Sequence, residues 1–561
     1  MVSAVKKLFK RDSTGVSEAA FLIGFFSLVS QLLALVRDRS LAHAIGPSHA
    51  LDVYYASFKI PDLLFVIIGT LVSVTAVLPF LVEKNAGDQN GENVSKFASQ
   101  LLVVITGLLV VLSIVGCIFM PLLVRIIAPG FDEATLAQLT HMSRIMLLSP
   151  TLLGISNLFG TFGQFYKRFF GFALAPVFYN LGIILGAVYL YPRFGLIGLS
   201  VGVISGAVMH LVVQAMPLFG TGLRFMMPEK IDWSEMKRLA FVSLPRAFTI
   251  SLSSLVFVVL SAIATTLPEG SVSLFTLSFN LQSVPLSVIG VSYAVALFPL
   301  LSDSIARGLR SDALATFARA YRHVAFWILP ITALFIVLRS HIVRIILGTG
   351  AFTWENTRLA AAALGIFAIG FFTQSAIALL VRVFYSDHNT RVPLRASLVG
   401  AGIIVLTAVV GISCYLSIPG FRGFFEAMLR VSNTGGAIML ILPTSYVIGS
   451  GVQAMILARF AKKLFSTTSF PGLHIAIGKS GLAALGLGLA TYGSLHFFVK
   501  IFSAQTFGGI LMQAFSSALV GAIAYVLILV VMKSQELAEM REAVKKKFAP
   551  ARILPDEIEK V

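Results

Sequence analysis

The densest group of ionisable side chains in this sequence lies inside a stretch that is otherwise apolar. It comprises six charged residues: Arg37, Asp38, Arg39, Asp52, Lys59 and Asp62. Charges at membrane depth are costly unless they are paired or hydrated, so they usually face a water-filled cavity. In such a cavity, guanidinium and ammonium groups would bind a phosphate, and the planar fork of Arg suits phosphate oxygens. The group therefore predicts a hydrated pocket for an anionic ligand, with Arg37 as its first candidate.

Spacing within the group favours one shared face. Asp52 and Lys59 are two helical turns apart, which places them on nearly the same side of a helix. Pro61 interrupts that helix and frees backbone groups, which is tolerated beside a water-filled cavity. The alternative for residues 37–39 is that they end the first helix at the outer membrane interface.

A further cation, Arg246, follows Pro245 near the start of a later apolar run. It could extend to the cytoplasmic headgroups or serve as a second cation of the cavity, and both readings stay open. The sequence has no HExxH motif, no phosphate-binding Gly-Lys-Ser/Thr loop and no GxSxG elbow. We therefore expect neither an enzyme nor a cofactor or metal site. Cys117 and Cys414 are expected to be packing residues.

The elements that hold these residues are apolar runs long enough to cross a bilayer. The chain of 561 residues is 57% hydrophobic and only 12% charged, with a mean hydropathy of +0.90. Such values exclude a soluble globular protein. About fourteen spans are predicted from the run lengths, and they lie near 17–36, 52–82, 98–127, 140–164, 170–192, 196–218, 239–266, 272–301, 317–347, 358–385, 393–416, 433–458, 472–499 and 507–532. The fold class is thus an all-α polytopic membrane protein.

The net charge of +18 is explained by membrane topology. Basic residues collect in alternate loops, and an excess of Lys and Arg is typical of cytoplasmic loops. Nucleic acid is therefore not an expected partner. These residues are Lys167, Arg168, Arg224, Lys230, Lys237, Arg238, Arg307, Arg310, Arg391, Arg395, Arg459, Lys462 and Lys463, with 545–547 in the tail. The pattern predicts cytoplasmic N- and C-termini and an even number of spans.

Two halves of the chain share a pattern. The same number of residues separates Pro79 from Gly130 and Pro299 from Gly350, and an Arg-Ile-Ile tripeptide precedes each glycine. We therefore expect a basic segment (1–16), two six-helix lobes (17–220 and 221–465), a helix pair (466–532) and a charged cytoplasmic tail (533–561). Two similar lobes that rock about a central site are typical of alternating-access transporters.

The stretch from Arg37 to Leu64, with its Asp52-Val53-Tyr54-Tyr55-Ala56 and Lys59-Ile60-Pro61-Asp62 runs, resembles the MurJ/MviN family of lipid II flippases. Further matches are Ala128-Pro129-Gly130-Phe131, Ala175-Pro176-Val177 with Asn180, Pro245-Arg246, Pro285 and Pro299. That family belongs to the multidrug/oligosaccharidyl-lipid/polysaccharide exporter superfamily. The resemblance covers about residues 17–460.

This resemblance implies that Arg37, Asp52 and Lys59 line a central cavity, with Arg37 on the lipid's diphosphate, and that the last two spans form a groove for the polyprenyl tail. The chain departs from the family pattern where an Asp-Arg pair and a later acid are usual. Phe279, Asn280 and Ser283 stand there instead. Arg246 and Asn280 are the candidate replacements in the substrate site, supported by Asp38, Arg39, Pro61, Asp62 and Ser283.

The expected function is that of an inner-membrane flippase for an undecaprenyl-diphosphate-linked, lipid II-like peptidoglycan precursor, needed for cell wall biogenesis and cell shape. The expected partners are this anionic lipid, membrane lipids, and a monovalent ion or the membrane potential. One alternative is an exporter of another lipid-linked oligosaccharide or amphiphile that is coupled to an ion through Asp52. The other is a membrane scaffold without transport activity.

Overall fold

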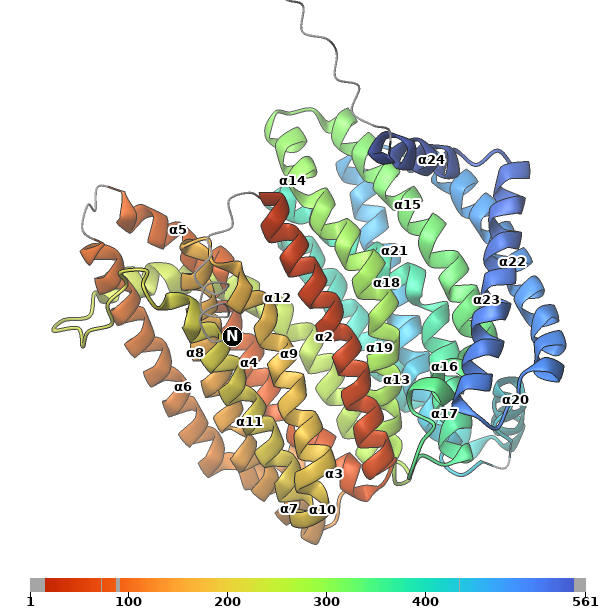
Figure 1. Cartoon of the computed structure of the whole chain (residues 1–561), viewed down its shortest axis with the longest axis horizontal. Coiled ribbons are helices and arrows are strands. Elements are labelled where there is room, and N and C mark those ends of the chain that lie inside the picture. The colour runs from red at the N-terminus through yellow and green to blue at the C-terminus, as the bar shows by residue number, and fades with distance from the viewer. Residues whose placement is uncertain (1–15, 72, 87–90, 433, 549–561) are drawn as a thin grey trace, which may run out of the picture. The chain divides into compact units, whose positions relative to one another are not determined.

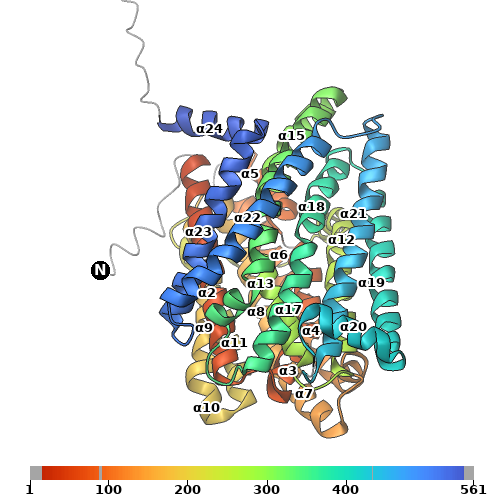
Figure 2. The same cartoon turned by 90° about the vertical axis from the view of Figure 1, so that its right-hand side faces the viewer.

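Helices account for nearly all of the computed structural model, which describes residues 16–71, 73–86, 91–432 and 434–548 (Figures 1 and 2). The first part of the chain holds α2 (Val16–Ala44), α3 (His49–Ser57), α4 (Lys59–Leu71), α5 (Val74–Asn85), α6 (Glu92–Ile127), α7 (Glu133–Met146), α8 (Leu148–Phe165), α9 (Phe169–Leu185), η1 (Gly186–Leu190), α10 (Tyr191–Phe194), α11 (Leu196–Ala215), η2 (Met216–Leu218) and α12 (Trp233–Thr265). The remainder holds α13 (Ser271–Pro285), η3 (Leu286–Val291), α14 (Ser292–Ala306), α15 (Arg310–Val337), α16 (Arg339–Ile346), α17 (Trp354–Ile369), α18 (Phe371–Ser386), α19 (Arg391–Ser417), α20 (Pro419–Leu429), η4 (Ala437–Leu440), α21 (Ile441–Leu464), α22 (Leu473–Ile501), α23 (Phe507–Val531) and α24 (Gln535–Phe548).

The length and composition of these helices fit a membrane protein. Among the described residues, ten helices are long and apolar enough to cross a bilayer, or eleven if α17 and α18 form one interrupted span. The other three predicted spans, 17–36, 52–82 and 239–266, each include residues or side chains outside the described part of the structure. Large apolar side chains also face outward, with Ile118 on α6 65% exposed and Leu489 on α22 74% exposed. Lipid tails are the environment in which such a surface is stable.

Two predicted elements differ from the structure in their details. The first helix continues to Ala44, so residues 37–39 lie inside it and do not end it. The predicted span 52–82 is divided into α3, α4 and α5. The first interruption lies at Phe58, ahead of Pro61. Pro61 itself sits in the first turn of α4, where a missing N–H costs little because helix starts have unpaired N–H groups.

The described chain divides into two compact units. The first contains Met1–Val284, Ser340–Phe367 and Arg391–Gln453, and the second contains Pro285–Arg339, Ala368–Thr390 and Ala454–Val561. In the second unit, Tyr525 of α23 packs on Phe326 of α15 and donates a hydrogen bond to its carbonyl at 2.6 Å. The helix α24 runs crosswise to α23 (Figures 1 and 2) and is tied to α15 by Glu539 and His323 at 2.8 Å. The division into two six-helix lobes stays a prediction.

Two turns join distant segments within the first unit, and we call them the glycine turns. The turn at Gly130, after α6, packs on the end of α12, and the N–H of Gly130 donates to Thr265 Oγ1 at 3.3 Å. The turn at Gly350, after α16, packs on the end of α2, and Ala351 N–H donates to the His43 carbonyl at 3.1 Å. A Cβ on either glycine would overlap a backbone carbonyl, that of Thr265 or of His43. The two anchors of the sequence repeat therefore occupy matching positions in the structure.

Candidate functional site

Arg37 is the centre of a polar network inside the first unit. Its Nε and Nη2 donate to Asp38 Oδ1 at 3.0 and 2.8 Å, and its Nη1 donates to Asn180 Oδ1 of α9 at 3.1 Å. The other oxygen of Asp38 accepts from Asn280 Nδ2 of α13 at 3.0 Å. The Asp38 side chain is buried, so it positions Arg37 and Asn280 at the same point. These contacts use three of the five guanidinium N–H bonds, which leaves one on each terminal nitrogen for a ligand.

The Arg37 network lines a cavity of about 290 Å³, which we call the cationic cavity. Its described walls come from six helices, α2, α3, α4, α9, α12 and α13. The lining residues are Arg37, Leu41, Tyr54, Tyr55, Phe58, Lys59, Asp62, Tyr179, Ile183, Phe257, Thr276, Phe279 and Asn280. The structure therefore brings together four of the sequence candidates that lie far apart in the chain: Arg37, Lys59, Asp62 and Asn280.

Lys59 contributes the second cation of this cavity. It is the first residue of α4, only 5% exposed, and its Nζ lies 4.1 Å from the ring centroid of Phe257 on α12. An ammonium over an aromatic face is attracted by the ring quadrupole. Asp62 lies one turn further along α4 and also faces the cavity. An ammonium held against an aromatic ring and a guanidinium in the same cavity can each donate hydrogen bonds to a phosphate group.

Asp52 lies elsewhere, contrary to the expectation that it lines the same cavity. Its Oδ2 accepts from Gly270 N–H and its Oδ1 accepts from Ser273 N–H, both at 2.8 Å. These are the orphan N–H groups at the start of α13, so Asp52 caps that helix from a distant segment and complements its dipole. Asp52 is 3% exposed. Because both oxygens accept hydrogen bonds from fixed backbone groups, Asp52 has a structural role in this arrangement.

Arg39 and Ser283 are not among the described residues that line the cationic cavity. Arg39 donates to the carbonyls of Ile345 and Ile346 at 2.5 and 3.4 Å, and so caps the end of α16. Ser283 donates to the Asn280 carbonyl at 2.7 Å within its own helix. The side chain of Arg246 lies outside the described part of the structure.

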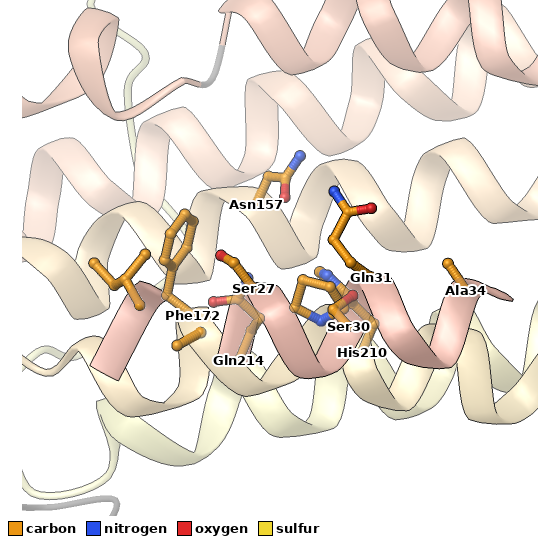
Figure 3. Close-up of a pocket in the computed structure, with 11 residues that line it drawn as sticks. Ser27, Ser30, Gln31, Ala34, Asn157, Phe172, His210 and Gln214 are labelled. Atoms are coloured by element: carbon orange, nitrogen blue, oxygen red, sulfur yellow. The ribbon is translucent and has the colours of Figure 1, made fainter. Parts of the chain in front are cut away.

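A second cavity of about 390 Å³ lies among α2, α8, α9 and α11, and we call it the neutral cavity (Figure 3). Its polar lining consists of hydroxyl, amide and imidazole groups, from Ser27, Ser30, Gln31, Asn157, His210 and Gln214. Figure 3 shows Asn157 of α8 across the cavity from Gln31 and Ser27 of α2. Within the described residues, no group of three or more His, Cys, Asp or Glu side chains could hold a metal ion.

Sequence reasoning did not single out two contributors to these sites. Asn180 hydrogen-bonds Arg37 and appeared in the sequence only as part of a motif match; its signal was a polar side chain inside an apolar run. Phe257, the ring beneath Lys59, has no such signal, because a phenylalanine in an apolar span is ordinarily a packing residue.

Comparison with solved structures identifies the fold. The chain has the fold of a structure described as lipid II flippase MurJ in an inward closed conformation, with a TM-score of 0.72 and 19% identity, covering 93% of this chain and 100% of that one. It also resembles an inward-facing multidrug resistance MATE family transporter of the MOP superfamily, with a TM-score of 0.64 and 14% identity, covering 78% of this chain and 94% of that one. The fold is therefore the all-helical, polytopic membrane fold of these structures.

The family follows from the sequence comparisons. The model of the lipid II flippase MurJ family matches residues 41–512, so the chain belongs to that family. A probable lipid II flippase MurJ of Bdellovibrio bacteriovorus is 25% identical over 548 residues, covering 95% of this chain and 98% of the relative. Its counterpart in Thermotoga maritima is 28% identical over 424 residues, covering 73% and 84%. The predicted resemblance is confirmed, and the chain is a transporter-family protein and not an enzyme.

Proposed function

We propose that this protein is a flippase that moves an undecaprenyl-diphosphate-linked, lipid II-like precursor from the inner to the outer leaflet of the bacterial inner membrane by alternating access. Membership of the lipid II flippase MurJ family supports this activity. The observation that carries the proposal is the cationic cavity, where Arg37 and Lys59 come together beside free guanidinium N–H bonds. Both cations can donate hydrogen bonds to the oxygens of a diphosphate, and Asp62 lines the same cavity.

Several parts of the proposal come from the sequence alone. Both termini lie in the cytoplasm, and α22 and α23 form the groove for the polyprenyl tail. The free energy for transport comes from a monovalent ion or the membrane potential, since the sequence has no nucleotide-binding motif.

The arrangement of Asp52 favours a flippase over the alternative of an exporter that is coupled to an ion through this residue. A coupling carboxylate must exchange its ligand during the cycle. Asp52 instead directs both oxygens to backbone N–H groups of a helix start. Releasing them would leave two buried N–H groups without acceptors, which is costly.

The test is rescue of bacterial cells that are depleted of their own lipid II flippase. The intact chain should restore growth, and Arg37→Ala should abolish rescue while the protein still accumulates in the membrane. Arg193→Ala is the matched control, because Arg193 is an exposed arginine of α10 that lines neither cavity and donates to the carbonyl of Tyr189 in the adjoining η1.

Normal growth with Arg37→Ala would contradict the proposed role of the cationic cavity. Failure of the intact chain to rescue, with normal accumulation, would favour a scaffold or an exporter of another amphiphile. Loss of rescue by both the Arg37→Ala and the Arg193→Ala proteins would point to a general loss of folding.

A further inference from the structure

The neutral cavity differs in chemistry from the cationic cavity. Among its lining residues that the structure describes, none is Asp, Glu, Lys or Arg, and His210 is the one titratable side chain. A diphosphate would find no cation there, and a metal or ammonium ion would find no carboxylate to balance its charge. Hydroxyl and amide groups both donate and accept hydrogen bonds, which suits a ligand that is polar and uncharged.

The size of the neutral cavity indicates a ligand with many atoms, such as part of a larger molecule, and not a single ion. Its volume of about 390 Å³ corresponds to roughly a dozen water molecules at ~30 Å³ each. This volume is within the range of pockets that bind small organic ligands. A single bare ion would contact only a few of the polar groups that line it. Phe172 and Pro176 add apolar surface to the wall, so the lining combines polar groups with apolar patches, as sites for small organic ligands commonly do.

One buried acceptor in this cavity lacks a partner. The side chain of Gln214 is only 2% exposed, and its Oε1 has no hydrogen-bond partner among the described residues. A buried carbonyl oxygen without a donor is unfavourable, and such groups in native proteins usually meet a ligand or water. A hydroxyl or N-acetyl N–H of a ligand would satisfy it.

The two cavities follow each other along one face of α2. Ser27, Ser30 and Ala34 line the neutral cavity, and Arg37 and Leu41 line the cationic one. Successive spacings of three and four residues keep these side chains on one side of the helix. Seven residues separate Ser30 from Arg37, which is ~10 Å along the axis at 1.5 Å per residue.

Asn180 hydrogen-bonds one lining residue of each cavity. Its Oδ1 accepts from Arg37 Nη1 at 3.1 Å, and its Nδ2 donates to Ser30 Oγ at 3.4 Å. The same amide therefore touches a wall of each cavity. A ligand that extends from one to the other would have an anionic group at Arg37 and an uncharged polar group beside Ser30.

We infer that the neutral cavity binds the uncharged carbohydrate part of a lipid-linked diphosphate whose phosphates lie at Arg37 and Lys59. This inference rests on the proposed function and deepens it, because it assigns a second binding site and the chemical class of its ligand. Ser27, Ser30, Asn157 and Gln214 recognise sugar hydroxyl and N-acetyl groups. Arg37 and Lys59 recognise the diphosphate.

The experiment compares two probes on the purified full-length protein: undecaprenyl diphosphate, and the same lipid carrying an N-acetylated disaccharide. Dissociation constants are measured for the intact chain, for Ser27→Val and for Gln214→Leu. Each variant removes one hydrogen-bonding group. Affinity for the disaccharide lipid should fall at least about fivefold while affinity for bare undecaprenyl diphosphate changes less than about twofold. Ser205→Val is the control, since Ser205 lies on α11 with Gln214 but lines neither cavity and bonds to the Val201 carbonyl.

The outcomes separate this inference from the proposed function. If the intact chain binds both lipids equally, or if Ser27→Val and Gln214→Leu weaken both lipids alike, the inference is overturned. Ser27 is exposed to the cavity, so Ser27→Val leaves the packing intact even where Gln214→Leu does not. If Arg37→Ala weakens neither lipid, the proposed diphosphate site fails instead.

Discussion

At the scale of single residues, the partners of each charge decide its role. Arg37, Arg39 and Asp52 looked alike in the sequence, as charges in an apolar stretch. Arg37 faces a cavity, whereas Arg39 binds two carbonyls at the end of α16 and Asp52 binds two N–H groups at the start of α13. Two of the three therefore complete the hydrogen bonding of helix ends, and one has donors left for a ligand.

Asp52→Asn gives a prediction at this scale. An Asn side chain has one acceptor oxygen, so one of the two N–H groups at the start of α13 would lose its partner. The free energy of unfolding should fall by about 1–3 kcal/mol, measured by thermal unfolding in detergent. Transport should fall only as far as the amount of folded protein does.

Asp303→Asn is the control for this prediction, because Asp303 forms an exposed ion pair with Arg307, and exposed pairs contribute little to stability. An Asp52→Asn protein with unchanged stability and no transport would contradict the structural role and support coupling through this carboxylate.

The sequence identified part of the candidate site and missed the rest for a physical reason. The cost of charge in a membrane singled out Arg37, Lys59 and Asp62, and the structure places them on one cavity. The partners of Asp52 are backbone atoms more than two hundred residues away, at Gly270 and Ser273. Every residue except proline carries the same N–H group, so the sequence holds no local signal of such a contact.

At the scale of elements, the run lengths were enough to predict most of the helices, because a bilayer fixes the length of an apolar span. The interruptions were harder. The proline at position 61 was expected to interrupt the helix. The break instead falls at Phe58, and Pro61 lies in the first turn of α4. Another proline, Pro285, ends α13 where a π-helical segment, η3, begins. A missing N–H can be accommodated by a local change of helix type, which sequence alone does not reveal.

The glycine turns give a prediction for the elements they join. Gly350 has a φ of +59°, and a Cβ there would also overlap the His43 carbonyl at the end of α2. The left-handed conformation alone costs a side chain roughly 1–2 kcal/mol. We therefore expect Gly350→Ala to lower the melting temperature of the purified protein clearly, and Gly130→Ala to do the same through its overlap with the Thr265 carbonyl.

Gly402→Ala is the matched control. Gly402 lies inside α19 with no atom near its missing Cβ, so alanine there should be neutral or slightly stabilising. If the Gly350→Ala protein has the same melting temperature as the intact chain, the turn at Gly350 is not tightly packed against the end of α2.

At the scale of the whole molecule, the charge distribution predicts a single topology. Basic residues gather in alternate loops, which predicts that both termini lie in the cytoplasm. Single cysteines at Ser13→Cys and Glu559→Cys, in a chain with Cys117 and Cys414 replaced by alanine, should react with a membrane-impermeant thiol reagent only after the cells are opened.

Lys500→Cys serves as the opposite control for topology. Lys500 is an exposed residue in the last turn of α22, in a loop that is predicted to lie outside, so its cysteine should react in intact cells. Reaction of either terminal cysteine in intact cells would contradict the predicted orientation.

The glycine turns also limit which substitutions this molecule tolerates. Each turn packs so closely on a backbone carbonyl at the end of another helix that the contact depends on the absence of a single methyl group. Even one added methyl group would therefore push the turn away from the helix end on which it packs, so these two positions admit less variation than the exposed helix surfaces do.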